Sequence, residues 1–155
     1  MAVQNVEAIL EELPFFRGMK KEHIVTLAGC ASNASFPEGQ AIFHQGEEAN
    51  HIYVIRSGKI AVEVEVADEG LVTIQTLEKD DVLGWSWLIP PYIWNFSARA
   101  VDPVRSLALD ARCLRGKCEA DPDLGYALLK RFSEVIVDRL RATRLQLMDI
   151  FGPTS

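Results

Sequence analysis

The chain has 155 residues, of which 48% are hydrophobic and 25% are charged, the balance of a globular protein with an ordinary core. Its length fits one domain of ~100–200 residues, and its net charge of −6 disfavours nucleic acid and anionic membranes as partners, because affinity for phosphates rests on basic residues. We therefore expect a single domain over residues 1–155 that binds neither.

The predicted elements include no membrane span and no targeting segment. The longest stretch without an ionised side chain, residues 82–98, is shorter than the ~20 residues of a spanning helix and contains Pro90 and Pro91. The acidic, amphipathic N-terminal stretch lacks the basic and apolar regions of a signal peptide. These features predict a cytoplasmic protein.

The three cysteines are Cys30, Cys113 and Cys118, and only the last two are close in sequence. A disulfide framework requires more cysteines, in an even number. Cys113 and Cys118 lack the second pair of ligands of a zinc or iron–sulfur site, and the histidines show no ligand spacing. We expect ordinary thiols and no metal.

The first thirty residues are predicted to form two helices. In each, apolar residues are three or four positions apart, and Pro14 interrupts the first pattern. The two apolar sets are Val6, Ile9, Leu10 and Leu13, and then Ile24, Leu27 and Ala28.

From Ala34 to Leu109, short apolar or alternating runs are separated by turn residues, which is typical of β-strands. Turn signals about every ten residues predict an antiparallel sandwich or barrel. The strand cores are 41–43, 51–55, 59–66, 71–77, 82–84, 96–101 and 104–109.

The strand 59–66 shows the clearest alternation and should have one buried and one wet face. The expected buried side chains are Ile60, Val62, Val64 and Val66, and the expected wet ones are Ala61, Glu63, Glu65 and Ala67.

The pattern returns to helix after Leu109. Asp110 is expected to cap a short helix through Cys118, and Asp121 to cap a long one that has Pro122 at its first position. The long helix should run for about 28 residues, or ~40 Å.

Such a helix extends past a small barrel, and its distal apolar stripe needs a covering surface. An identical helix of a second copy supplies one, so we expect a homodimer. In the alternative, the last two turns fold back or fray. The residues assigned to the dimer helix are Phe132, Ile136, Leu140, Thr143 and Leu147.

The segment PEGQAIFHQGEEANHIYVIRSGKIAVEV resembles the entry to the cyclic nucleotide-binding domain family, which includes bacterial catabolite activator-type regulators and the regulatory subunits of cyclic-nucleotide-dependent kinases. Gly39, Gly46 and Gly58 stand where that family turns between strands, and residues 52–55 fill its central strand. The preceding LPFFRGM resembles the family's N-terminal entry. The resemblance covers roughly residues 13 to 150 and implies a mainly β jelly-roll barrel with flanking helices.

The resemblance also implies a ligand site, the phosphate-binding cassette. In the family it reads Gly-Glu, a short helix, and then an Arg. The Arg guanidinium pairs with the cyclic phosphate, and the Glu carboxylate accepts a hydrogen bond from the ribose 2′-hydroxyl. The aligned stretch here is LGWSWLIPPYIWNFSARAV, in which Gly84 matches, Trp85 stands at the Glu position and Trp94 at the Arg position. Both charged contacts are missing. Arg99 is the nearest replacement if it shares a pocket-facing side of its strand with Asn95 and Ser97.

Aromatic side chains replace the charged ones. The cassette residues assigned to the vestigial ligand site are Gly84, Trp85, Ser86, Trp87, Trp94, Asn95 and Arg99. Three interpretations stay open: the rings fill the former pocket, they line a site for a nucleotide or another flat or apolar ligand, or some are exposed as a protein-docking patch.

No enzyme signature is present, and no cofactor is predicted with certainty. The resemblance implies a stand-alone regulatory or sensory module that does not bind cAMP in the usual way and acts through a protein partner. The alternative is a ligand-free accessory subunit of a larger enzyme complex, such as a redox enzyme. Since the long helix ends near Phe151, we expect no winged DNA-binding domain.

Overall fold

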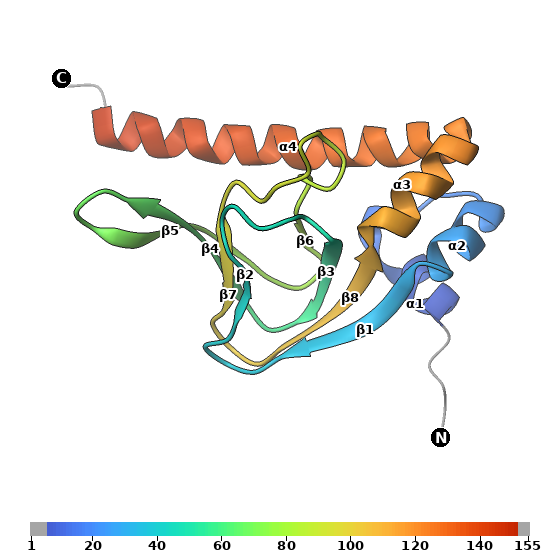
Figure 1. Cartoon of the computed structure of the whole chain (residues 1–155), viewed down its shortest axis with the longest axis horizontal. Helices are drawn as coiled ribbons and strands as arrows, with labels where there is room; N and C mark the ends of the chain where they lie inside the picture. The colour runs from blue at the N-terminus through green and yellow to red at the C-terminus, as the bar shows by residue number, and fades with distance from the viewer. Residues whose placement is uncertain (1–5, 152–155) are drawn as a thin grey trace.

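The computed structural model describes residues 6–151, except for the side chains of 146, 147 and 149–151. The secondary-structure elements follow the predicted order, with helices before and after a β unit (Figure 1). In chain order they are α1 (Val6–Glu12), the 3-10 helix η1 (Pro14–Phe16), α2 (Lys21–Ala28), β1 (Ala31–Phe36), β2 (Ala41–Phe43), β3 (His51–Ser57), β4 (Ile60–Val66), β5 (Gly70–Leu77), β6 (Val82–Leu83), β7 (Ser97–Ala100), β8 (Val104–Asp110), α3 (Ala111–Ala120) and α4 (Pro122–Phe151).

The strands form two four-stranded antiparallel sheets with the orders β1-β8-β3-β6 and β2-β7-β4-β5. Both orders bring strands from distant parts of the chain together, as in a jelly roll. Ile52 and Val54 of the first sheet and Ile60 and Val62 of the second are fully buried in one core cluster, because alternate residues of a strand face the same side. The predicted mainly β jelly roll with flanking helices is confirmed.

The strand β1 was missed by the sequence analysis. Its sequence ASNASF has small and polar residues and a mixed burial pattern, so neither β propensity nor alternation marks it. It forms because it pairs with β8 over six residues, from Ala31 opposite Leu109 to Phe36 opposite Val104. Pairing with a buried strand overrides its weak local preference.

The predicted wet face of β4 is wrong in its first half. Ala61 and Glu63 are buried, whereas Val66, expected to be buried, is exposed. The reason is sheet position: β4 pairs with β7 only from Ile60 to Glu63, and beyond Glu63 only β5 accompanies it. The end of β4 therefore belongs to a hairpin that projects from the roll (Figure 1).

Both predicted helix caps are confirmed. The Asp110 carboxylate accepts a hydrogen bond from the Cys113 N–H at 2.8 Å, and the Asp121 carboxylate accepts from the N–H groups of Asp123 and Leu124 at 3.2 and 3.3 Å. These oxygens satisfy amide donors that have no partner inside the first helical turn. The long helix α4 has 30 residues.

The expectation of three ordinary thiols is wrong for two of them. Cys30 and Cys113 form a disulfide whose Cα atoms are 5.8 Å apart, across a sequence separation of 83 residues. The pair consists of the residues distant in sequence because the register of β1 with β8 places the start of β1 beside the start of α3. Cys118 is a free thiol.

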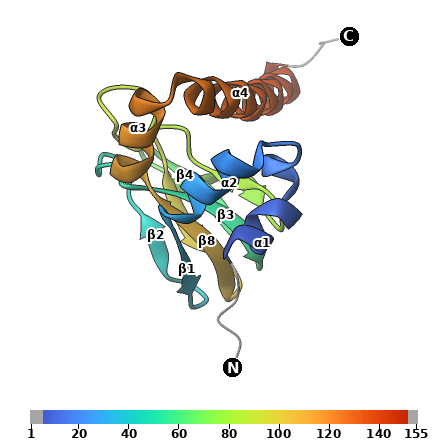
Figure 2. The ribbon, with the colours of Figure 1, turned by 90° about the vertical axis from the view of Figure 1, so that its right-hand side faces the viewer.

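The helix α4 lies along one side of the roll, with α1 and α2 nearer its amino end (Figures 1 and 2). Leu124, Leu128 and Phe132 bury its first half in the core. Its second half extends over the side of the molecule from which the β4–β5 hairpin projects (Figure 1). Among residues 6–151, no helix is both long enough and apolar enough to cross a membrane.

Candidate functional site

The candidate site is the segment between β6 and β7, residues 84–96, which we call the cassette. It begins at Gly84, whose φ of +104° is readily adopted only by glycine. A Cβ atom at Gly84 would overlap the six-membered ring of Trp94. The Trp94 ring therefore lies directly against the cassette backbone at its first residue.

Trp94 is packed on all sides and is only 2% exposed. Its ring stacks on that of Phe43, with centroids 3.7 Å apart and planes at 4°, and a tilted contact joins it to Phe96 at 5.9 Å. The Trp94 N–H donates to the Glu47 carbonyl and its carbonyl accepts from the Gly46 N–H, both at 2.9 Å. The loop between β2 and β3 thus fixes the backbone of Trp94 while Phe43 fixes its ring.

The other two tryptophans link the cassette to α4. Trp85 is half-buried, with its ring 5.7 Å from that of Phe96 and 5.0 Å from the Arg139 guanidinium of α4. Trp87 is fully buried and meets the Phe132 ring edge to face at 5.3 Å. The cassette therefore meets α4 at two points, through Trp85 on Arg139 and through Trp87 on Phe132.

Two polar atoms of the cassette are buried without a hydrogen-bond partner among the described residues, namely Ser86 Oγ and Trp87 Nε1. Ser86 is 3% exposed. Of the predicted site residues, the structure brings Gly84 and Trp94 into direct contact, while Trp87 packs on Phe132 of α4.

The helix α3 holds the outer part of the cassette through Arg115. Its Nη1 donates to the Trp87 carbonyl at 2.7 Å, and its guanidinium lies 4.2 Å from the centre of the Tyr92 ring. Ile89, between these two anchors, is 51% exposed, and Ile93, directly after the second, is 36% exposed. Arg115 is not predicted from the sequence, because no local pattern indicates contacts with Tyr92 and Trp87, which precede it by 23 and 28 positions.

Arg99 and Asn95 are not brought to the Trp94 ring. Arg99 points to the outer face of β7 and forms an ion pair with the buried Glu63 carboxylate at 2.9 Å. Hydrogen bonding to that carboxylate raises the pKa of Arg99. Ser97 lies on the same face and accepts a hydrogen bond from the Gln45 N–H at 2.9 Å, and Asn95 is exposed. Because alternate residues of a strand lie on the same face, Ser97 and Arg99 both point away from the core.

Arg139 is a second site residue that the sequence analysis missed. Its Nη2 donates to the Val82 carbonyl, its Nη1 is buried without a partner among the described residues, and burial lowers its pKa to about 10 against the opposing effect of Asp81. Its position seven residues after Phe132 was the available signal, because such residues share a helix face.

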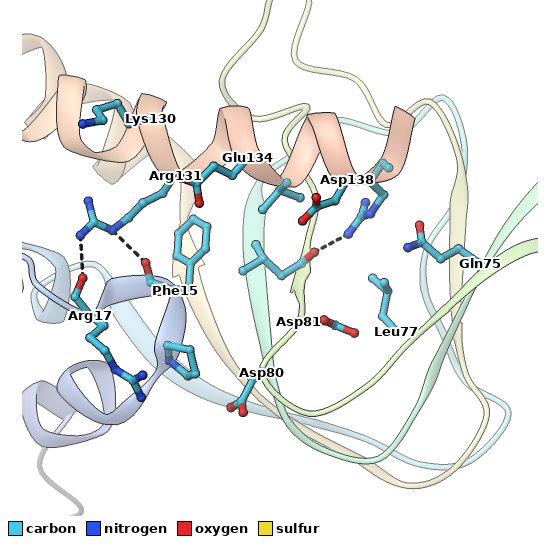
Figure 3. Close-up of a pocket in the computed structure, with 14 residues that line it drawn as sticks. Phe15, Arg17, Gln75, Leu77, Asp80, Asp81, Lys130, Arg131, Glu134 and Asp138 are labelled. Carbon is cyan, nitrogen blue, oxygen red and sulfur yellow. Dashed lines mark hydrogen bonds between the residues drawn. The ribbon is translucent and has the colours of Figure 1, made fainter. Parts of the chain in front are cut away.

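A groove of about 550 Å³ lies below α4, between η1 and the ends of β5 and β6 (Figure 3). Both signs of charge line it: the carboxylates are Asp80, Asp81, Glu134 and Asp138, and the cations are Arg17, Lys130, Arg131 and Arg139. Arg131 already donates to the Phe15 and Arg17 carbonyls at 2.9 and 2.8 Å. The groove is separate from the Trp94 ring and favours no single charge of ligand.

The residues predicted to form the dimer seam of α4 lie partly in the core and partly at the surface. Phe132 is 1% exposed and packs on the Phe15 ring at 4.9 Å, so its assignment to the dimer seam is wrong. Ile136 is half-buried, Thr143 is exposed and donates to the Arg139 carbonyl, and Leu140 is 63% exposed. The side chain of Leu147 lies outside the described residues.

Comparison with known proteins identifies the family. A model of the cyclic nucleotide-binding domain matches residues 34–121, more than half of the chain. A CRP-like cAMP-activated global transcriptional regulator of Mycobacterium tuberculosis is 29% identical over 147 residues, which are 94% of this chain and 63% of that protein. The chain thus spans somewhat less than two thirds of the length of that curated relative.

Two solved structures have the same fold. A cyclic nucleotide-binding domain from Methylobacillus flagellatus has a TM-score of 0.79 at 18% identity, over 97% of this chain and 85% of the other. The regulatory subunit of a cAMP-independent protein kinase A from Trypanosoma brucei has a TM-score of 0.67 at 24% identity, over 82% of this chain and 45% of the other. The chain belongs to the cyclic nucleotide-binding domain family, as its sequence predicted.

Proposed function

We propose that this chain is a regulatory module of its family whose cassette does not bind cAMP in the usual way. The observation that carries the proposal is the Trp94 ring, which lies against Gly84 and stacks on Phe43. In the family pattern this position holds the arginine that pairs with the cyclic phosphate. A ligand would have to displace a buried indole and would find no counter-charge.

The absence of the family's Glu and Arg should by itself greatly weaken the affinity for a cyclic nucleotide. Loss of one charge-assisted contact to a buried ion typically costs ~2–5 kcal/mol, or a factor of ~30 to several thousand in affinity. Trp85 replaces the second charged contact, the family's Glu, and its ring is held between Phe96 and Arg139. Arg99 offers no substitute, because Glu63 holds it on the outer face of β7.

We propose further that the module acts in the cytoplasm as a homodimer, without enzymatic activity, through a protein partner. The dimer would form along α4. There the apolar stripe that begins at the buried Phe132 continues through the half-buried Ile136 to the exposed Leu140. The exposed Ile89 and Ile93 of the cassette favour the second candidate function, an accessory subunit of a larger complex, since apolar anchors on a fixed loop suit protein docking. That one fold relative is a regulatory subunit of a cAMP-independent kinase agrees with regulation without cAMP.

The test is a thermal-shift panel with cyclic mononucleotides, cyclic dinucleotides, NADH, flavin and haem. A ligand at 100 times its dissociation constant stabilises a protein by ~2.7 kcal/mol, which is easily measured. We expect no shift of the wild type with cAMP or cGMP. A saturable shift with either would contradict the proposal, and a shift with another compound alone would identify a different ligand.

The partner is tested separately by purification of the natively expressed protein under mild conditions. A module that works as a sensor on its own should be recovered as a dimer. An accessory subunit should be recovered with stoichiometric companions, and an Ile89→Ser/Ile93→Ser variant should lose them while it keeps its stability. Recovery of a monomer without companions would contradict both forms of the proposal.

A further inference from the structure

The cysteine pair lies at a junction of three elements. Cys30 stands between α2 and β1 and is 6% exposed, and its carbonyl accepts a hydrogen bond from the Asp110 N–H at 2.8 Å. Cys113 is half-buried in the first turn of α3, and its N–H donates to the Asp110 carboxylate. The pair therefore fastens the start of α3 to the edge of the roll.

We propose that Cys30 and Cys113 form a reversible redox site, oxidised by a low-molecular-weight disulfide, whose state sets how firmly α3 holds the cassette. In the first step, the Cys113 thiolate attacks one sulfur of the small disulfide, which forms a mixed disulfide and releases one small thiolate. The Cys30 thiolate then attacks Cys113 Sγ, which closes the protein disulfide and releases the second. The protein loses two protons and two electrons, and the small disulfide is reduced to two thiols.

The order of these steps follows from exposure. Cys113 is half-buried and open to solvent in part, whereas Cys30 is nearly inaccessible, so an external disulfide reaches Cys113 first. Their Cα separation of 5.8 Å lies within the ~4.4–6.8 Å usual for disulfides, and the second step therefore needs no rearrangement of the backbone.

The third cysteine is not part of this site. Cys118 lies five residues after Cys113 on α3, on a different face of the helix. It packs against the start of α4, where a Cβ at Gly125 would lie 3.5 Å from the Cys118 Cβ. Burial, together with Asp121, raises the pKa of the Cys118 thiol, which reduces its thiolate fraction and its reactivity. Cys118 serves as an internal control.

The link from the disulfide to the cassette is short. Arg115 lies two residues after Cys113, and it binds the Trp87 carbonyl and covers the Tyr92 ring. Reduction removes the covalent tether of this helical turn, while Ala111 and Leu114 keep α3 on the core. We expect the turn to open more often without unfolding of the roll, and the contacts of Arg115 with the cassette to open with it.

The reversibility of the site rests on the proposed cytoplasmic location. In a reducing cytoplasm a disulfide is typically transient and senses redox state, whereas in an oxidising compartment it is permanent. The proposal is independent of nucleotide binding, because it concerns α3 and the outer part of the cassette rather than the Trp94 position.

The test uses the full chain, equilibrated with mixtures of reduced and oxidised glutathione from equal amounts to a large excess of the reduced form. Alkylation and non-reducing peptide mapping report which cysteines are linked. We expect the Cys30–Cys113 linkage to appear with oxidised glutathione and to disappear in the excess of reduced glutathione. A linkage that involves Cys118, no linkage at all, or a linkage that persists in the excess would overturn the proposal.

Two further measurements test whether the oxidation state of the cysteine pair changes how firmly α3 holds the cassette. Reduction should lower the apparent Tm by roughly 10 °C, since the cross-link closes a long loop, and should speed amide hydrogen exchange at residues 87–93. Cys118→Ser should respond as the wild type does, whereas Cys113→Ser should resemble the reduced protein under all mixtures. Exchange at residues 87–93 that does not change with oxidation state would contradict the link to the cassette.

Discussion

Trp94 stacks on Phe43 with their ring centroids 3.7 Å apart and their planes within 4° of parallel. Phe43 belongs to β2, and Trp94 lies near the end of the cassette. The Trp94 ring is packed between Phe43 and the backbone of Gly84. Trp94 and Phe43 are therefore part of the core of this protein. We propose that this packing stands where the family has its ligand site.

The first prediction concerns the contribution of Trp94 to stability. Trp94→Ala should lower the free energy of unfolding by about 3–5 kcal/mol, because it removes a buried indole and leaves a cavity. Asn95→Ala, next to it and exposed, should change it by less than about 0.5 kcal/mol. Urea denaturation measures both. A Trp94→Ala variant as stable as the wild type would mean that the ring is not a core residue.

The second prediction isolates the contact between Trp94 and Gly84. Gly39→Ala should cost only the strain of a positive φ, about 1–2 kcal/mol, since nothing lies within 4 Å of its added Cβ. Gly84→Ala should cost about 1–3 kcal/mol more, because its Cβ overlaps the indole. In a Trp94→Leu background this excess should fall. An equal cost at both glycines would show that the ring does not lie on Gly84.

The parts of the fold predicted correctly from sequence are those with strong local signals. Asp110 and Asp121 are capping residues directly before helical runs, and both form the expected hydrogen bonds. β1 was missed because pairing with β8, and not its own sequence, makes it a strand. The disulfide was missed because 83 residues separate Cys30 from Cys113 and only the tertiary structure brings them together.

The sequence indicates candidate members of the site but not the contacts between them. The alignment of motifs found Gly84, Trp85 and Trp94, yet only the structure reveals which rings touch. Arg139 reaches Trp85 from α4, a helix that begins only at Pro122, well after the end of the cassette. Such contacts depend on the packing angle of α4, which residue spacing does not determine.

The third prediction concerns the dimer. In the homodimer that we propose, Leu140→Asp should separate the two subunits, because it places a charge in the apolar seam along α4. Leu145→Asp is a matched control, since Leu145 is 62% exposed but lies five residues on, toward another face of the helix. Light scattering measures the mass. Equal masses for Leu140→Asp and wild type would remove Leu140 from the interface.

The fourth prediction concerns Phe132, which the structure assigns to the core. Phe132→Ala should lower the free energy of unfolding by about 3–5 kcal/mol, through lost contacts with the Phe15 and Trp87 rings. Leu140→Asp should leave the stability of the isolated roll nearly unchanged. A Phe132→Ala protein that unfolds as the wild type does but loses its dimer would restore the original assignment.

The fifth prediction separates Arg99 from ligand binding. Arg99→Ala leaves the buried Glu63 carboxylate unpaired and should destabilise the protein, toward the low end of ~3–5 kcal/mol because Arg99 is half-exposed. The double variant Arg99→Ala/Glu63→Gln should recover part of this loss. The thermal-shift profile with ligands should be the same in all three proteins, and its change in Arg99→Ala alone would show that Arg99 contacts a ligand.

The most direct test of the central claim is isothermal titration calorimetry of cAMP into the wild-type protein and into the Trp85→Glu/Trp94→Arg variant, which restores both charged residues of the family cassette. We predict no saturable heat for the wild type and measurable 1:1 binding for the folded variant. Micromolar 1:1 binding of cAMP to the wild type would contradict the claim that Trp94 has replaced the ligand.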